Sequence, residues 1–164
     1  MKEIVEKISS YNILNNLFPG IIFAVIASKI TTYNFIIPND VLGVFVYYFI
    51  GMIMSRIGSL LVENVLRRVR LIKFKPYRDY ITASQYDDKI EILSETNNTY
   101  RTIIATMITL IMVKLYNLLS EYLQLCIEVD FIVSATVIII IFIIAYKKQV
   151  LFISKRIDAA NKLN

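Results

Sequence analysis

The chain has 164 residues, of which 57% are hydrophobic, and its mean hydropathy is +0.60. A soluble domain of this length is about half apolar and about a quarter charged. Here 18 basic and 13 acidic residues stand in blocks between long uncharged runs. The chain is more apolar than one soluble domain can hide, so the pattern predicts an integral membrane protein.

The sequence contains no His and a single Cys, Cys126. The lack of imidazole excludes histidine general bases, histidine-based catalytic triads and histidine metal ligands. One cysteine excludes an intrachain disulfide and a Cys-rich zinc site. The four glycines form neither a phosphate-binding loop nor a dinucleotide fingerprint. We therefore expect neither enzyme activity nor a bound cofactor.

Four segments are apolar enough to cross a hydrocarbon layer about 30 Å thick, which takes roughly 20 helical residues. In chain order these predicted spans are residues 18–37, 41–62, 102–119 and 131–146. Many of their residues are β-branched, but an isolated apolar run in lipid must satisfy its own backbone hydrogen bonds and is therefore helical. The expected fold is all-α, with four transmembrane helices in two hairpins and a small helical loop between the hairpins.

Residues 1–17 place apolar side chains at helical spacing, which predicts an interfacial helix leading into the first span. Pro19 cannot donate a backbone hydrogen bond, so Pro19 and Gly20 are expected to mark a helix junction or, alternatively, a hinge. We favour a junction whose freed carbonyl is satisfied by an Asn side chain. Residues 25–27 have the small-residue spacing of a signal-peptidase site, but Pro19 and Gly20 interrupt the apolar stretch, which favours an uncleaved span.

Basic residues are distributed unevenly between the connecting segments. The loop 63–101 holds eight and the tail 147–164 holds five, whereas residues 31–40 and 121–130 hold none. Positive charge is retained on the cytoplasmic side of a membrane. We therefore expect a multi-pass membrane protein with both termini and the loop 63–101 in the cytoplasm.

The loop 63–101 begins with a cluster of basic residues directly after the second span: Arg67, Arg68, Arg70, Lys73, Lys75 and Arg78. Each gains about 1 kcal/mol near an anionic leaflet, so contact with membrane lipids explains the cluster. Phe74, Tyr77 and Tyr80 stand among these charges and would suit base stacking, but direct nucleic-acid binding is the less favoured alternative. The loop is longer than a hairpin needs, which indicates a docking surface for a cytoplasmic protein partner.

Four carboxylates follow at helical spacing: Asp87, Asp88, Glu91 and Glu95. They could bind a divalent metal, but a solvated helix face is favoured, so no metal site is expected. The C-terminal tail 147–164 is amphipathic. It is expected to extend the fourth helix, to lie on the membrane surface, or to dock on the helix of the middle loop.

Three basic residues, Lys29, Arg56 and Lys114, lie inside predicted spans. Near span ends such side chains reach water or acidic partners, which is favoured here; Arg56 and Lys114 are also candidates for pore lining or a charge switch. The second span also carries a stripe of small residues: Gly51, Ser55, Gly58 and Ser59. Small residues let helices approach closely, within one chain or between chains.

The order of these features includes Ser9-Ser10-Tyr11-Asn12, an early Pro19-Gly20, four spans and a compact charged loop. In this plan the chain resembles small membrane proteins encoded with bacterial antiphage defence systems, the membrane subunit of the Kiwa system among them. The resemblance implies a homo-oligomeric assembly of the bacterial inner (cytoplasmic) membrane that senses infection or transmits it to a cytoplasmic partner. It also implies the alternative of an oligomeric pore that permeabilises the membrane.

Overall fold

The computed structural model describes residues 10–161, which are helices joined by turns and loops, without a strand. The helices, with bounds, are α2 (Ser10–Asn12), the π-helix η1 (Ile13–Leu17), α3 (Phe18–Ile30), α4 (Asp40–Ile57), the π-helix η2 (Gly58–Val62), α5 (Glu63–Arg68), α6 (Tyr77–Ser84), α7 (Lys89–Leu123) and α8 (Ile127–Asn161). Because α2, η1 and α3 follow one another without a break, as do α4, η2 and α5, they form two long helices. With α7 and α8, four helices are long and apolar enough to cross a membrane. The predicted all-α fold with four candidate spans is confirmed.

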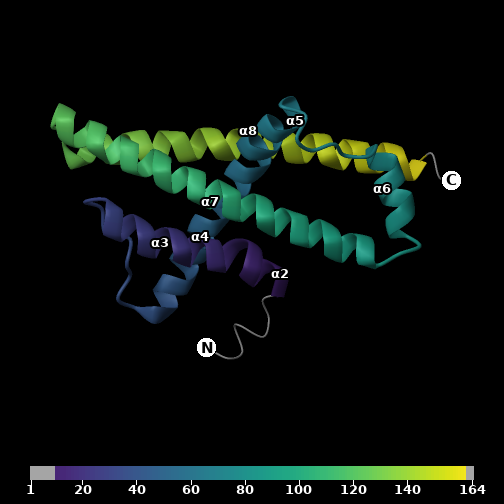
Figure 1. Ribbon diagram of the computed structural model, residues 1–164, viewed down its shortest axis with the longest axis horizontal. Helices are drawn as coiled ribbons and strands as arrows, with labels where there is room; N and C mark the ends of the chain where they lie inside the picture. The colour runs from purple at the N-terminus through teal and green to yellow at the C-terminus, as the bar shows by residue number, and fades with distance from the viewer. Residues whose placement is uncertain (1–9, 162–164) are drawn as a thin grey trace.

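The two ends of the molecule differ in character (Figure 1). At the left of the figure lie the two connections 31–39 and 124–126, which we call the hairpin end. Residues 63–88, the start of α7 and the last turns of α8 lie toward the other end, which we call the basic end because it holds the basic loop. Helices α7 and α8 run from one end to the other, whereas α3 and α4 meet the hairpin end and α4 crosses the long axis steeply (Figure 1).

The core lies between α3, α4 and α7, together with the two π-helices. Its buried apolar residues come from all three helices: Phe23, Ala27, Ile53, Met54, Ile57, Val62, Ala105 and Leu110. Two glycines bring α3 and α4 together, since a Cβ at Gly20 would overlap the carbonyl of Tyr47 and a Cβ at Gly51 would overlap the carbonyl of Asn16. The helices cross with backbone against backbone, as small residues permit.

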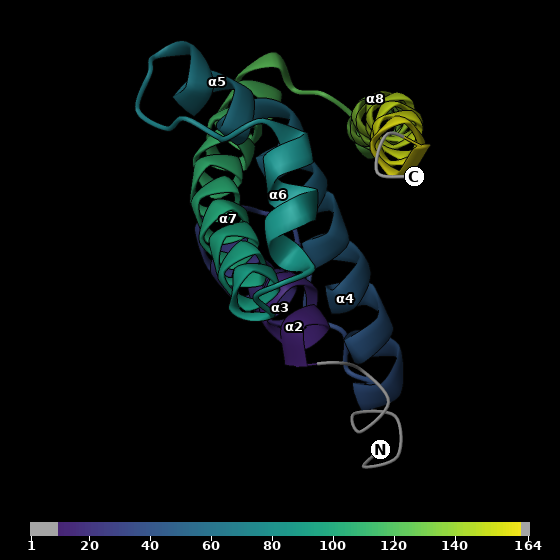
Figure 2. The same cartoon turned by 90° about the vertical axis from the view of Figure 1, so that its right-hand side faces the viewer.

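Helix α8 stands apart from this core (Figure 2). It packs on α4, η2 and α6 rather than on α7, to which the turn 124–126 joins it. Phe142 stacks on Phe49 of α4, with 6.1 Å between ring centroids. Among residues 127–159 only Ala145 and Ala159 are buried. The second predicted hairpin is therefore consecutive in the chain but is not a packed pair of helices.

The predicted span 18–37 is corrected at both ends. The candidate span covers Ile13–Ile30 within the first long helix. The helix ends at Ile30, because the amides of the loop that follows bond to side chains instead of helix carbonyls. The N–H of Thr32 donates to Asn117, that of Phe35 to Ser28, and that of Ile37 to the Tyr47 hydroxyl. Because side chains accept hydrogen bonds from these amides, this apolar loop need not be helical.

The segments around the spans also differ from expectation. Residues 1–9 of the predicted interfacial helix lie outside the described residues, and residues 13–17 form η1, which packs on α4 as part of the first long helix. The loop 63–101 is not separate from the third span, because α7 already begins at Lys89. The tail continues α8 as far as Asn161 and also contacts α6, where Phe152 meets Tyr77 with ring centroids 6.0 Å apart. Residues 162–164 lie outside the described residues.

Candidate functional site

A buried network of polar side chains joins the three core helices near the basic end. Asn15 of η1 is 3% exposed, and its Nδ2 donates to Ser55 Oγ at 3.2 Å. Its Oδ1 accepts from the Thr102 hydroxyl of α7 at 2.8 Å. Asn16, also buried, donates to the Tyr48 hydroxyl at 3.3 Å. Buried polar groups without such partners would cost stability, so this network fixes how η1, α4 and α7 meet.

The stripe of small residues is used within the chain. Gly51 meets the backbone of Asn16 and Ser55 accepts from Asn15, so both face η1. A Cβ at Gly58 would lie 3.2 Å from the carbonyl oxygen of Arg101, which places Gly58 against α7. Ser59 faces α8. The stripe therefore serves as a packing surface for three other elements of the same molecule.

Pro19 and Gly20 lie in the first turn of α3, directly after the π-helix η1. Because η1 and α3 form one continuous helix, Pro19 lacks an amide that would otherwise bond to a carbonyl of the preceding turn. The predicted role of a nearby Asn is corrected: Asn15 and Asn16 bond across to other helices and do not serve a carbonyl freed by Pro19. The π-helix, a form that often marks functional positions, was not expected from the sequence.

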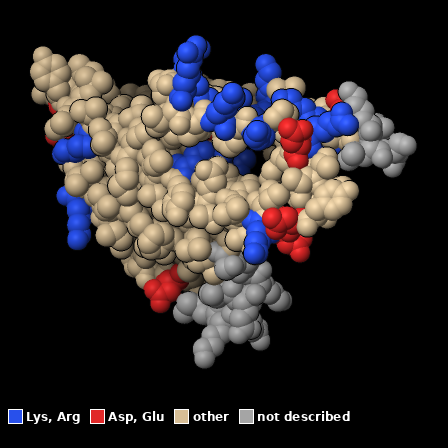
Figure 3. All heavy atoms as spheres, turned by 45° about the vertical axis from the view of Figure 1, so that its right-hand side comes forward, with Lys and Arg blue, Asp and Glu red and all other residues tan. Residues whose placement is uncertain are grey.

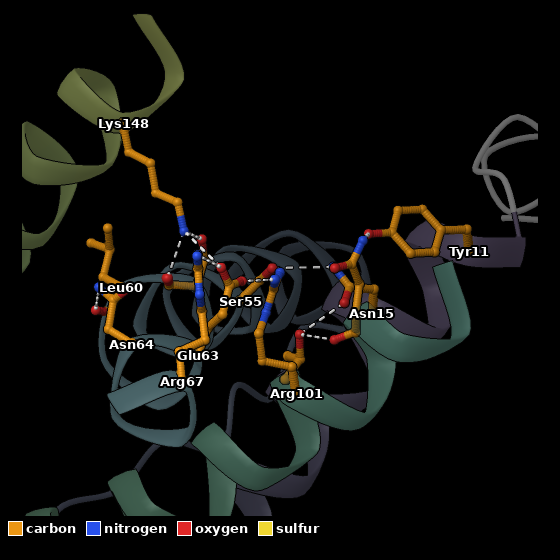
Figure 4. Close-up of polar contacts among 12 residues, drawn as sticks. Tyr11, Asn15, Ser55, Leu60, Glu63, Asn64, Arg67, Arg101 and Lys148 are labelled. Atoms are coloured by element: carbon orange, nitrogen blue, oxygen red, sulfur yellow. Dashed lines mark hydrogen bonds and ion pairs between the residues drawn. The ribbon is translucent and has the colours of Figure 1, made fainter. Parts of the chain in front are cut away.

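One carboxylate at the start of α5, Glu63, gathers basic residues from three helices (Figure 4). Its Oε2 lies 2.7 Å from Arg101 Nη1 of α7, and its Oε1 lies 3.6 Å from Lys148 Nζ of α8 and 3.9 Å from Arg67 Nη1. Lys148 also donates to the carbonyl and the hydroxyl of Ser59, both at 2.7 Å. This Glu63 cluster ties the basic end of α8 to the core.

The Glu63 cluster carries excess positive charge. Three cationic side chains face a single carboxylate, whose side chain is only 12% exposed. In addition, Nε of Arg101 is buried without a hydrogen-bond partner in the described part of the chain. A site with this imbalance favours an anion.

The predicted basic cluster lies on the surface of the basic end, where Figure 3 shows Lys and Arg side chains gathered. Its six members are exposed: Arg67, Arg68, Arg70, Lys73, Lys75 and Arg78. Among the described residues only Arg67 of this set forms an ion pair, and its guanidinium also lies 5.6 Å from the ring centroid of Phe74. The other five charges take no part in holding the fold together.

The aromatic residues beside these charges are engaged within the protein. Tyr77 stacks on Tyr80 with 6.2 Å between centroids and also contacts Phe152 of α8. The Arg67 guanidinium lies over the ring of Phe74, which is still 48% exposed. These rings pack α6 and its connection against the rest of the molecule, so the arrangement is not an open row of rings for base stacking.

The three basic residues of the predicted spans lie in different surroundings. Arg56 is half-buried and lines a narrow space of about 30 Å³ between the α4–η2 helix and α8. Lys114 is half-buried in α7, and Lys29 is exposed at the end of α3. Within residues 10–161 none of them forms an ion pair. The expected acidic partners for the two lysines are therefore absent among these residues.

A second polar cluster, absent from the predictions, forms at the hairpin end around Asp130 of α8. Its carboxylate accepts hydrogen bonds from Tyr33 at 2.9 Å, Tyr116 at 2.8 Å and Ser120 at 2.9 Å. Burial raises the pKa of the Tyr33 phenol, which therefore stays protonated and able to donate. The partners come from the first loop and from α7. No local pattern in the sequence signals contacts between residues so distant.

The predicted acidic helix face is corrected, because Asp87 and Asp88 precede α7 and only Glu91 and Glu95 lie within it. Asp87 accepts a hydrogen bond from the N–H of Lys89 at 3.0 Å. Residues 10–161 contain no group of three or more His, Cys, Asp or Glu placed to hold a metal ion. Cys126 is free and exposed at the hairpin end.

Comparison of the chain with protein-family models, with curated proteins and with solved structures finds no match in any of the three. The function is therefore inferred from the geometry of the chain itself.

Proposed function

We propose that the chain is a multi-pass protein of the bacterial inner membrane that acts as a homo-oligomeric scaffold or sensor. In this proposal the basic end faces the cytoplasm and presents a docking surface to a cytoplasmic partner with an acidic surface. The resemblance to antiphage membrane subunits suggests infection as the signal that the assembly reports.

The observation that carries this proposal is the free positive charge of the basic end. Five of the six basic-cluster residues make no ion pair among the described residues, whereas Arg101 and Lys148 are the cations that hold the helices together. Exposed positive charge beside four candidate spans suits both an anionic membrane surface and an acidic protein. Helix α7 has 35 residues, about 50 Å at 1.5 Å per residue. Its polar first turns would project beyond a hydrocarbon layer of about 30 Å.

Orientation is tested first, with a membrane-impermeant maleimide on intact spheroplasts. The native Cys126 is exposed at the hairpin end and should be labelled from outside. In a Cys126→Ser background, Lys73→Cys should be labelled only after the membrane is opened. Labelling of Cys126 from the inside alone would reverse the proposed topology.

Partner docking is tested with a photo-crosslinking amino acid in place of Leu71, which is 74% exposed at the basic end. Tyr122, 84% exposed at the hairpin end, is the matched control position. We expect a defined cytoplasmic protein to crosslink at position 71 and not at 122. Neutralising Arg68, Arg70 and Lys73 to Gln should abolish the adduct while Cys labelling shows unchanged insertion; an adduct that survives neutralisation contradicts the proposal.

An oligomeric pore is the alternative function. It is supported by the long apolar surface of α8, which the core leaves uncovered and which a second copy could cover. It requires ion flux from purified oligomers in liposomes, and flux that changes in Arg56→Ala or Lys114→Ala. Intact oligomers that carry no ions would exclude the pore and leave the scaffold.

A further inference from the structure

An apolar cavity of about 200 Å³ lies between α8 and the α4–η2 helix; it is open on one side, where several of its lining side chains are half exposed. Its walls are formed only by aliphatic side chains, among them Ile57, Leu61, Val137, Ile140 and Ile144. An apolar cavity of about 150 Å³ is sufficient to bind a benzene-sized molecule. This cavity therefore has room for a stretch of hydrocarbon chain.

The cavity leads toward positive charge. Leu60 lines it and also lines the narrow space of about 30 Å³ around Arg56, whose walls include Lys148 and Gln149. Along α8 the lining thus changes from isoleucine to lysine within about one turn after Ile144. Arg56 has no ion pair among the described residues, and Lys148 belongs to the Glu63 cluster with its excess of cations.

From this arrangement we infer a binding site for an anionic phospholipid. One acyl chain lies in the apolar cavity, and the phosphate of the headgroup lies against Arg56 and Lys148. The site depends on the proposed membrane location. Basic pockets between membrane helices on the cytoplasmic side bind such headgroups, and a guanidinium can hold a phosphate with two hydrogen bonds.

The dimensions favour a lipid over the other occupants. A helix from a second copy is about 10 Å wide with its side chains, so it could cover the cavity from outside but could not enter it, whereas an acyl chain can. Free phosphate would use only the space beside Arg56 and leave the apolar cavity empty. A phospholipid fills both parts and supplies the negative charge that the Glu63 cluster lacks.

The headgroup contact is tested by native mass spectrometry of the purified full chain with phosphatidylglycerol or phosphatidylcholine of identical acyl chains. We expect phosphatidylglycerol to bind more tightly, and Arg56→Gln to weaken it about fivefold, the change that corresponds to about 1 kcal/mol for one cation. Lys114→Gln, which removes a half-buried cation of α7, is the control and should change nothing. Equal binding of the two lipids, or equal loss in both variants, would overturn the site.

The contact with the acyl chain is tested by filling the cavity with a larger side chain. Ile140→Phe should lower phosphatidylglycerol binding severalfold, whereas Ile139→Phe, one residue away and 58% exposed outside the cavity, should not. Inorganic phosphate should not compete with the lipid; competition at equal concentration would show a phosphate site and overturn the lipid assignment.

Failure of this inference is separable from failure of the proposed function. A chain that sediments with membranes and labels with the expected topology, but shows no preference for phosphatidylglycerol, refutes the lipid site alone. A chain recovered in the soluble fraction without detergent refutes both.

Discussion

The three-helix core and α8 are attached to the molecule in different ways. Helices α3, α4 and α7 meet along much of their length through two glycine contacts, a buried polar network and small apolar side chains. Helix α8 is held by hydrogen bonds at two places, at Asp130 in its first turn and at Lys148, beyond which Phe152 also contacts Tyr77 of α6. Between them lie the Phe49–Phe142 stack and an open apolar cavity.

In the proposed membrane location the solvent is itself apolar, and the difference then indicates which contacts specify the fold. In lipid, isoleucine on isoleucine gains little over isoleucine on an acyl chain, so close backbone approach and hydrogen bonds determine packing. The core has both along its length, whereas the hydrogen bonds of α8 to other elements lie at Asp130 and Lys148. A helix attached in this way can keep a lipid or another copy beside its middle turns.

The largest effect is expected where the core helices cross. In Gly51→Ala the new Cβ would overlap the backbone carbonyl of Asn16, which cannot move without separating η1 from α4. We expect a loss of about 3 kcal/mol or more of stability, at the upper end of overpacking effects. Thermal unfolding in detergent, followed by size-exclusion chromatography, measures it.

Gly43→Ala is the matched control for this prediction. Its Cβ would lie 3.3 Å from the ring of Tyr47, a side chain that can shift slightly. This variant should unfold within a few degrees of the parent protein. Equal destabilisation by both alanines would show that the crossing is looser than described.

A smaller loss is expected from Asn15→Leu, which removes the centre of the buried network. Ser55 loses its donor from Asn15, and the Thr102 hydroxyl loses one acceptor but keeps the Asn98 carbonyl within reach. We expect a cost of about 1 to 2 kcal/mol. Because Ser55→Ala removes part of the same network, the double variant should lose less than the sum of the single losses. Additive losses would show that the two side chains act independently.

The length and hydropathy of the uncharged runs were enough to predict the long helices of the core and α8. Residues 41–62, 102–119 and 131–146 all lie within helices, because long uncharged runs are helical wherever lipid surrounds them. The end of the first helix at Ile30 could not be predicted from the sequence. It depends on hydrogen bonds that the loop amides donate to Asn117 and Tyr47, which belong to other helices.

The basic cluster and the Glu63 cluster also differ in whether the sequence could predict them. The exposed basic cluster could be predicted, because a run of charges after an apolar segment is a local pattern. The Glu63 cluster could not, since Glu63 meets Arg101 38 residues further along the chain, and nothing near Glu63 in the sequence marks that partner. Long-range pairings of single polar residues, such as those of Asp130 and Asn15, depend on how the helices are arranged.

The smallest effect is expected at the attachment of α8. Lys148→Met removes the bonds to Ser59 and the ion pair with Glu63 but keeps the length of the side chain. The basic end of α8 should then separate from η2 more often. In a Cys126→Ser background, Ala145→Cys reports this motion, because Ala145 is buried against the core and is labelled only when α8 moves away. A partly exposed pair of this kind is worth up to about 1 kcal/mol, so labelling should quicken about threefold to fivefold.

Asp130→Asn, which alters the attachment at the hairpin end, should leave labelling at position 145 unchanged if the two attachments of α8 are independent. Equal acceleration by both variants would mean that α8 moves as one rigid rod about a single contact, and the division between a specified core and a helix held at two places would not stand.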